Sequence, residues 1–296
     1  MSQILQYIFS GVTVGSIYAI VAIGFNLIYS TTGVLNFAQG EFVMLGGMTA
    51  VTLAAFVPLP VAVVLAVALV MVFGAVLELL FFRRLKRPTP LQMIIITIGL
   101  SIVIREVALH VWDEKPHSLP YFSGDECTSV TVLGAAISPQ VFWVCGTLCL
   151  TVILLHLFMR HTLTGRAMRA CASNVEAAML AGIHVSRLRT LSFMISAGIG
   201  ALGGCVIAPI TMTQYDHGTS LAIKGFASAV LGGLGGHAAA VPAGLLVGLA
   251  ESFSVYAGLP AAYKDAAAFT ILVVVLILRP HGLFASRGLA SLEDRA

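Results

Sequence analysis

The polar residues with the clearest spacing lie in residues 160–189, the longest polar stretch of an otherwise largely apolar chain. Ser173 and Glu176 have the S-x-x-E spacing of a capping box, in which two side chains satisfy free backbone N–H groups at a helix start. Gly182 stands where a glycine commonly ends a helix. We therefore predict a short capped helix over residues 174–181, in a basic loop to which a soluble partner could bind.

One side of this predicted helix forms a small apolar ridge. On a helical wheel the ridge consists of Val175, Ala178, Met179 and Gly182. Small residues let another surface approach closely, so the ridge fits a groove of a partner protein. The alternative is a stable connector on which nothing docks, and the spacing alone is compatible with both.

A second polar group, Asn36, Gln39 and Glu41, opens an apolar segment. An ionisable side chain at membrane depth is costly and usually faces a cavity or a partner. The group either lines a transport path or holds a bend there, or it sits at the membrane interface and caps a helix. The predicted topology places it near the interface and so favours the structural interpretation.

Three more charged residues, Glu78, Arg105 and Glu106, lie within apolar segments. Arg105 and Glu106 are adjacent, so on a helix they point about 100° apart and do not simply pair with each other. The position one turn after Glu78 is Phe82, so no basic partner stands there. We expect these charged residues to pair between helices or to extend toward the membrane surface.

Motifs for enzymatic chemistry are absent from the sequence. It contains no H-E-x-x-H and no G-x-S-x-G, and its eight histidines include no pair at i, i+4. It also lacks a Walker A motif, so it does not bind ATP through a P-loop. Cys145 and Cys149 are expected to be reduced packing residues, and Cys127 has no evident partner. We expect no metal, no cofactor and no catalytic residue, and any ATP that drives this protein is hydrolysed by another polypeptide.

The elements that hold these residues are membrane helices. The 296 residues are 58% hydrophobic and 10% charged, whereas soluble domains carry about 25% charged residues. Continuous apolar runs of about 20 residues recur along the chain, which favours helices over a β-barrel. The sequence therefore predicts an all-α polytopic membrane protein with a single transmembrane domain over residues 1–296. The small net charge of +3 indicates no nucleic-acid partner.

Nine candidate membrane segments follow from the apolar runs. They cover about residues 4–29, 34–57, 60–82, 91–112, 139–159, 190–210, 219–236, 238–257 and 263–280. Segment 34–57 opens with polar residues, and segment 219–236 carries Lys224 and four glycines near its end. Either of these two is a candidate for a re-entrant or broken helix, so we predict eight or nine crossings.

Glycines predict where helices pack closely. Gly11 and Gly15 have small-xxx-small spacing in the first segment. The run Gly232–Gly236 has no strand before it and no Gly-Lys-Ser/Thr after it. It therefore predicts close packing and a tight reversal between two spans rather than a phosphate-binding loop.

Lysines and arginines indicate the orientation in the membrane. The loops 83–90 and 160–189 and the C-terminal tail are basic, whereas the loop 113–138 carries one lysine against four acidic residues. The first three are therefore predicted to be cytoplasmic, and 113–138 to lie outside. Nine crossings then place the N-terminus outside and the C-terminus inside. The first segment has no basic n-region and no A-x-A site, so we expect a retained span.

Several stretches resemble one family of transport proteins. Glu176-Ala177-Ala178, followed after three residues by Gly182, resembles the EAA loop of ABC importer permeases, which couples the membrane subunit to its ATPase. Five further stretches are similar to the branched-chain amino acid permease family of the LivH type: residues 15–20, 33–42, 165–170, 224–235 and 263–284. One departure is Gln39, where many relatives carry a histidine.

The resemblance implies the permease subunit of an ATP-driven ABC importer for branched-chain or other hydrophobic amino acids, in a bacterial inner membrane. It implies as partners a second homologous permease subunit, two cytoplasmic ATP-binding subunits, a periplasmic solute-binding protein and the lipid bilayer. The outer loops 113–138 and 211–218 would receive solute, and Asn36, Gln39 and Glu41 would line the path or hold a bend. The ATPase-coupling residues would be Ser173, Glu176, Ala177, Ala178, Met179 and Gly182.

Other functions remain open from the sequence. Permeases for urea or short amides resemble the same family. A stand-alone secondary transporter or channel would be driven by an ion gradient and would have no use for an EAA-like helix. An intramembrane enzyme would need a nucleophile and base or a metal site within the spans, and the sequence shows neither.

Overall fold

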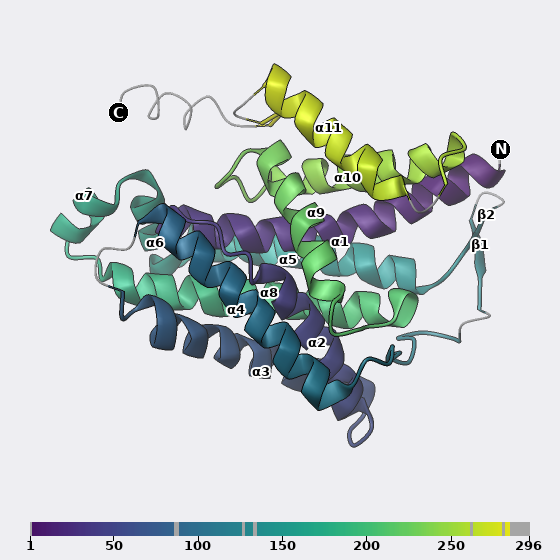
Figure 1. Cartoon of the computed structure of the whole chain (residues 1–296), viewed down its shortest axis with the longest axis horizontal. Coiled ribbons are helices and arrows are strands. Elements are labelled where there is room, and N and C mark those ends of the chain that lie inside the picture. Colours follow the sequence, from purple (N-terminus) through teal and green to yellow (C-terminus); the bar gives the residue numbers. More distant parts are fainter. Residues whose placement is uncertain are drawn as a thin grey trace.

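The computed structural model describes residues 2–85, 89–125, 128–132, 135–260, 263–279 and 282–284, which form a bundle of helices (Figure 1). A short π-helix, η1 (Glu78–Phe82), continues α3, and the strands β1 (Val130–Val132) and β2 (Ala135–Ile137) pair as an antiparallel hairpin. The α-helices are α1 (Ser2–Thr32), α2 (Gln39–Ala54), α3 (Leu59–Leu77), α4 (Pro90–Trp112), α5 (Gln140–His161), α6 (Leu163–Ser173), α7 (Val175–Leu180), α8 (Val185–Thr211), α9 (His217–Gly232), α10 (Ala240–Tyr256) and α11 (Lys264–Leu278).

The helical architecture is the predicted one. Each of the nine predicted segments contains a helix. In the described part of the chain, five helices are long and apolar enough to cross a membrane: α1, α3 with η1, α4, α5 and α8. The other four segments hold helices of 15 to 17 residues, namely α2, α9, α10 and α11. A membrane-spanning helix needs about 20 residues, so these four reach less far than the sequence pattern indicated.

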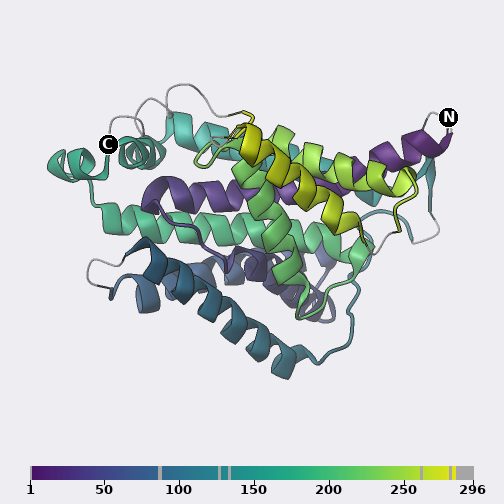
Figure 2. The ribbon, with the colours of Figure 1, turned by 45° about the horizontal axis from the view of Figure 1, so that its top comes forward.

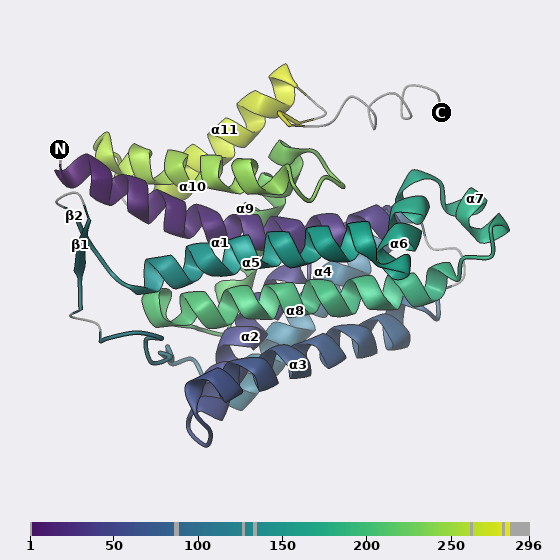
Figure 3. The same cartoon turned by 180° about the vertical axis from the view of Figure 1, so that it is seen from behind.

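Helix α1 lies at the centre of the bundle. It packs against α5, α8, α9 and α10, and its residues 15–28 are buried throughout. Toward its N-terminus it meets α10 backbone to backbone, because a Cβ on Gly15 would lie 2.9 Å from the carbonyl oxygen of Gly244. The small-residue spacing of Gly11 and Gly15 therefore marks a close helix contact, as predicted. Figure 3 shows α5 and α8 side by side on the face opposite to that of Figure 1.

Segments 34–57 and 219–236, the two candidates for a re-entrant or broken helix, contain the short helices α2 and α9. Helix α1 ends at Thr32, and the chain turns at Gly33, whose φ is +67°. Residues 34–38 are not helical, so α2 begins only at Gln39. Helix α9 crosses the direction of α1, α8 and α10 at a steep angle in both Figure 1 and Figure 2. It ends at Gly232, and positive φ values at Gly233 and Gly235 make the predicted tight reversal.

The connections gather at two opposite ends of the bundle (Figure 1). Helices α6 and α7, the end of η1 and the start of α4 lie at one end, whereas the start of α1 and the strands β1 and β2 lie at the other. The segment 113–138 is tied to the α8–α9 connection, because His117 and Thr213 exchange two backbone hydrogen bonds of 2.9 and 2.7 Å. Several residues used in the sequence predictions lie outside the described residues: Lys86, Arg87, Glu126, Cys127, Pro280, His281, Arg287 and Arg295.

Candidate functional site

The predicted loop helix is present as α7, but its N-terminal cap differs from the prediction. Asn174 is the N-cap, and its Oδ1 accepts a hydrogen bond of 2.9 Å from the backbone N–H of Ala177. Ser173 is the last residue of α6, so the predicted capping box of Ser173 and Glu176 is wrong. The reason is that the backbone break falls at Asn174, which is extended with φ −159° and ψ 111°. An asparagine is as good an N-cap as a serine, and S-x-x-E spacing does not distinguish the two.

Gly182 ends α7 with the geometry of a Schellman motif. Its φ is +81°, and its N–H donates to the carbonyl of Met179 at 3.0 Å. The N–H of Ile183 donates to the carbonyl of Ala178, also at 3.0 Å. These two bonds satisfy carbonyl groups that a helix end otherwise leaves free. Helix α7 is therefore capped at both ends.

The side chains of α7 face two ways. Ala178 is buried in a core cluster with Met168 and Cys171 of α6 and Leu188 of α8. The predicted ridge is therefore not continuous, because Ala178 points into the chain itself. Val175 and Met179 are exposed, as are Glu176, Ala177 and Gly182. Leu180, which the wheel did not include in the ridge, is 91% exposed and is the most accessible apolar side chain of α7.

The second predicted group, Asn36, Gln39 and Glu41, lies inside the bundle rather than at a solvated helix end. All three residues are buried, with at most 2% exposed. Asn36 Oδ1 accepts a hydrogen bond from the backbone N–H of Ala38, which holds the turn before α2. Gln39 donates to the backbone carbonyl of Ser196 in the middle of α8, at 3.2 Å, and accepts from the Ser196 hydroxyl at 2.7 Å.

Glu41 joins three helices. Its Oε1 accepts hydrogen bonds from Ser101 of α4 at 2.8 Å and from Thr219 of α9 at 3.3 Å. Its Oε2 has no hydrogen-bond partner among the described residues, although Glu41 is fully buried. The backbones of α2 and α9 touch beside it, since a Cβ on Gly40 would overlap the carbonyl oxygen of Gly218.

Polar groups buried between short helices are typical of substrate-binding or moving parts of membrane transporters. Transporters place polar groups at the ends of short or broken helices near the middle of the bilayer. A buried carboxylate with one oxygen unpaired is costly unless the surrounding helices hold it in place. Helices α2 and α9 are both short, and they meet where Glu41 is held. Arg105 and Glu106 form no ion pair with each other in the described part of the chain.

A cluster of charged residues, which the sequence analysis did not identify, joins α1, α9, α10 and α11; Lys224 and Glu251 are buried in it, whereas Lys264 and Asp265 are about half exposed. Lys224 Nζ lies 3.1 Å from Glu251 Oε1 and 2.7 Å from Asp265 Oδ1. The Tyr18 hydroxyl donates to Glu251 Oε2 at 2.7 Å, and Lys264 lies 3.5 Å from Glu251 Oε1. Two positive and two negative charges balance one another. The sequence signal that could have revealed this cluster is the presence of Lys224 and Glu251 in neighbouring apolar segments.

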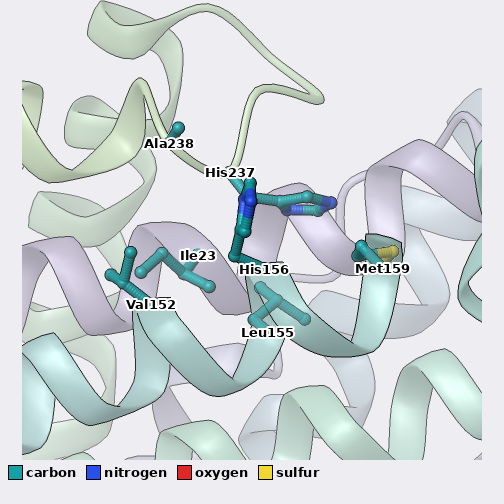
Figure 4. A pocket seen from close by; sticks show the side chains of 7 residues that line it. All are labelled: Ile23, Val152, Leu155, His156, Met159, His237 and Ala238. Carbon is teal, nitrogen blue, oxygen red and sulfur yellow. The ribbon is translucent and has the colours of Figure 1, made fainter. Parts of the chain in front are cut away.

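Two histidines meet in a pocket between α5 and the α9–α10 connection (Figure 4). The rings of His156 and His237 lie next to each other there. Burial lowers the pKa of His237 from its ordinary 6.5 to about 4, so the ring is neutral at pH 7. The described residues include no group of three or more metal ligands. The pocket is lined by Ile23, Val152, Leu155, His156, Met159, His237 and Ala238.

Comparison with known proteins places this geometry in context. The sequence model of the family described as "Branched-chain amino acid transport system / permease component" matches residues 7–276. The chain is 31% identical to the high-affinity branched-chain amino acid transport system permease protein LivH of Escherichia coli (strain K12), over 94% of each chain. It is 32% identical to the corresponding protein BraD of Pseudomonas aeruginosa, over 94% of this chain and 95% of the relative. The ribose import permease protein RbsC of E. coli is 26% identical over 74% of this chain. No solved structure matches significantly.

The charge cluster gives a prediction for stability. Lys224→Met leaves Glu251 and Asp265 without their shared cation, so we expect the free energy of unfolding to fall by about 3 kcal/mol. Lys264→Met is the matched control. Lys264 is about half exposed and its ion pair is longer, so its loss should change stability by less than about 1 kcal/mol. Thermal unfolding of the detergent-purified variants measures both, and equal midpoints for the two would contradict a stabilising role of Lys224.

Proposed function

The chain belongs to the branched-chain amino acid transport permease family, and we propose that it is the permease subunit of an ATP-driven importer for branched-chain or other hydrophobic amino acids. The observation that supports this most strongly is the match to LivH and BraD over nearly the whole of each chain. The ribose permease is less similar and covers less of the chain, which favours an amino-acid solute over a sugar. The chain itself does no covalent chemistry, and ATP is hydrolysed by separate subunits.

The proposed assembly contains two related permease subunits, two cytoplasmic ATP-binding subunits and a periplasmic solute-binding protein. The permease domain spans residues 1–296 and lies in a bacterial inner membrane, with the N-terminus outside and the C-terminus inside. The opposite placement of α6 and α7 and of the β-hairpin supports this orientation, because the basic loop and the acidic loop then face opposite sides. The outer loops 113–138 and 211–218 receive solute.

Helix α7 is proposed as the contact with the ATPase. It is capped at both ends, it is seated on α6 and α8 through Ala178, and it exposes Val175, Met179 and Leu180 at the end of the bundle. A rigid element with exposed apolar side chains can insert into a groove and transmit a movement without bending. The neighbouring Glu176, Ala177 and Gly182 line the same contact, whereas Ser173 contributes only as the end of α6.

Movement of α7 then alters the packing of the spans between inward-open and outward-open states. We assign the solute path to the region where α2 and α9 meet, with Asn36 and Gln39 holding the bend and Glu41 at the crossing. The backbone contact of Gly40 and Gly218 keeps this crossing closed in the present structure. Separation of α2 from α9 would expose the free oxygen of Glu41.

The proposed assembly can be tested by isolation of the complex. Tagged chain is isolated from native membranes in mild detergent, and the eluate is analysed by mass spectrometry and for ATPase activity. We expect a P-loop ATPase and a second polytopic subunit in the eluate. Leu180→Ser should lower ATPase recovery by about tenfold, because a central apolar anchor of a contact is lost. Phe56→Ser also removes an exposed apolar side chain, at 83% exposure, but between α2 and α3, and should leave recovery unchanged. Recovery of the chain alone would contradict the proposed assembly.

The proposed solute path can be tested at Glu41. Glu41→Gln keeps the size of the side chain and an oxygen that accepts from Ser101 and Thr219, but it removes the charge. We expect leucine uptake to fall by about tenfold while the ATPase is still recovered with the chain. Glu106→Gln makes the same change at an exposed position of α4 and should have no effect. Wild-type uptake in Glu41→Gln would remove Glu41 from the path and leave it a structural role.

A further inference from the structure

Helix α3 changes its winding at its C-terminal end. From Glu78 to Phe82 it continues as the π-helix η1, and the N–H of Arg83 donates to the carbonyl of Glu78, five residues back, at 2.9 Å. A π-turn holds one extra residue within a helix and is found frequently at functional sites. Both Glu78 and Phe82 are buried, so this turn is packed into the bundle rather than frayed.

The π-turn is held by the first turns of α8. Glu78 Oε1 accepts a hydrogen bond from Arg189 Nε at 2.7 Å, and Glu78 Oε2 accepts one from the Thr190 hydroxyl. The ring of Phe82 packs on that of Phe193 with centroids 4.9 Å apart. The predicted pairing of Glu78 between helices is thus present, with a partner distant in sequence. We call these five residues the Glu78 clamp.

The clamp is directly connected to α7. After the Schellman motif at Gly182 only Ile183 and His184 precede α8, and the His184 carbonyl accepts from the N–H groups of Arg187 and Leu188. Leu188 also packs in the same core cluster as Ala178. Helix α7 and the first turns of α8 therefore form one rigid unit, and Arg189 and Thr190 belong to it.

We infer that the Glu78 clamp transmits the movement of α7 into α3, with the π-turn as the joint. This inference rests on the proposed contact between α7 and the ATPase. The Glu78 carboxylate is fully buried, so separation from Arg189 would leave an unpaired charge in the interior. When α8 moves, η1 is pulled with it. A π-turn that gives up its extra residue to become α-helix rotates the adjoining helix by about 100°, which makes it a two-state element.

Glu78 is accordingly a positioning residue. Its test has to distinguish a loss of coupling between ATP hydrolysis and transport from a loss of folded protein. The complex is purified from native membranes and reconstituted in vesicles, and leucine uptake and ATP hydrolysis are measured in the same vesicles. Glu78→Gln should leave ATP hydrolysis without solute near the wild-type rate but lower the leucine transported per ATP by about tenfold. Thr190→Val removes one hydroxyl from the clamp and keeps the Arg189 pair, so a smaller fall in the same ratio is expected.

The ratio distinguishes the outcomes. Loss of folded protein lowers uptake and ATP hydrolysis together and leaves the ratio of leucine to ATP unchanged. Glu106→Gln should change neither the amount of folded protein nor this ratio. If Glu78→Gln fails to insert into the membrane, Thr190→Val decides the question. A wild-type ratio in every variant that inserts would overturn the clamp while leaving the proposed function intact. Wild-type vesicles that accumulate leucine without ATP would instead overturn the proposed function.

Discussion

Polar backbone inside a membrane protein has to be satisfied by the protein itself, and this constraint determines the structure around the break between α1 and α2. Residues 34–38 leave the helix within the packed bundle, so Asn36 supplies a hydrogen bond to the turn and Gln39 binds the backbone of α8. The Ser196 hydroxyl, which also reaches the carbonyl of Gly24, ties the break to α1. Helix α2 is short because residues 34–38, which precede it, are not helical.

Helix α9 connects two polar groups, one around Glu41 and the other around Lys224. Thr219 at its start binds Glu41, and Lys224 one to two turns further on pairs with Glu251 and Asp265. A shift of α9 therefore changes the contacts of α2 on one side and of α10 and α11 on the other. The backbone bridge between His117 and Thr213 joins the connection from α4 to α5 to this arrangement, just before α9 begins.

Much of this could be predicted from the sequence, and the exceptions have physical reasons. Each of the nine continuous apolar runs contains a helix in the described part of the chain, and the two segments that carry polar residues or a glycine run contain α2 and α9, which meet at Glu41. The polar contacts between distant segments were not accessible, because Glu78 and Arg189 or Lys224 and Asp265 are brought together only by packing. Local caps were also ambiguous: Ser173 and Asn174 are both good N-caps, and the backbone break decided for Asn174. The burial of Ala178 depends on α6 and α8, which a helical wheel of α7 alone does not include.

We propose that this chain is a membrane subunit driven by ATP that other subunits hydrolyse. The most direct measurement is uptake of labelled leucine into cells that express the complete transport system, with the ion gradient and the ATP pool controlled separately. We expect uptake to continue when the gradient is collapsed and ATP is maintained, and to stop when ATP is depleted and a gradient is imposed. Uptake that follows the gradient and ignores ATP would contradict this proposal and would make α7 a simple connector between two spans.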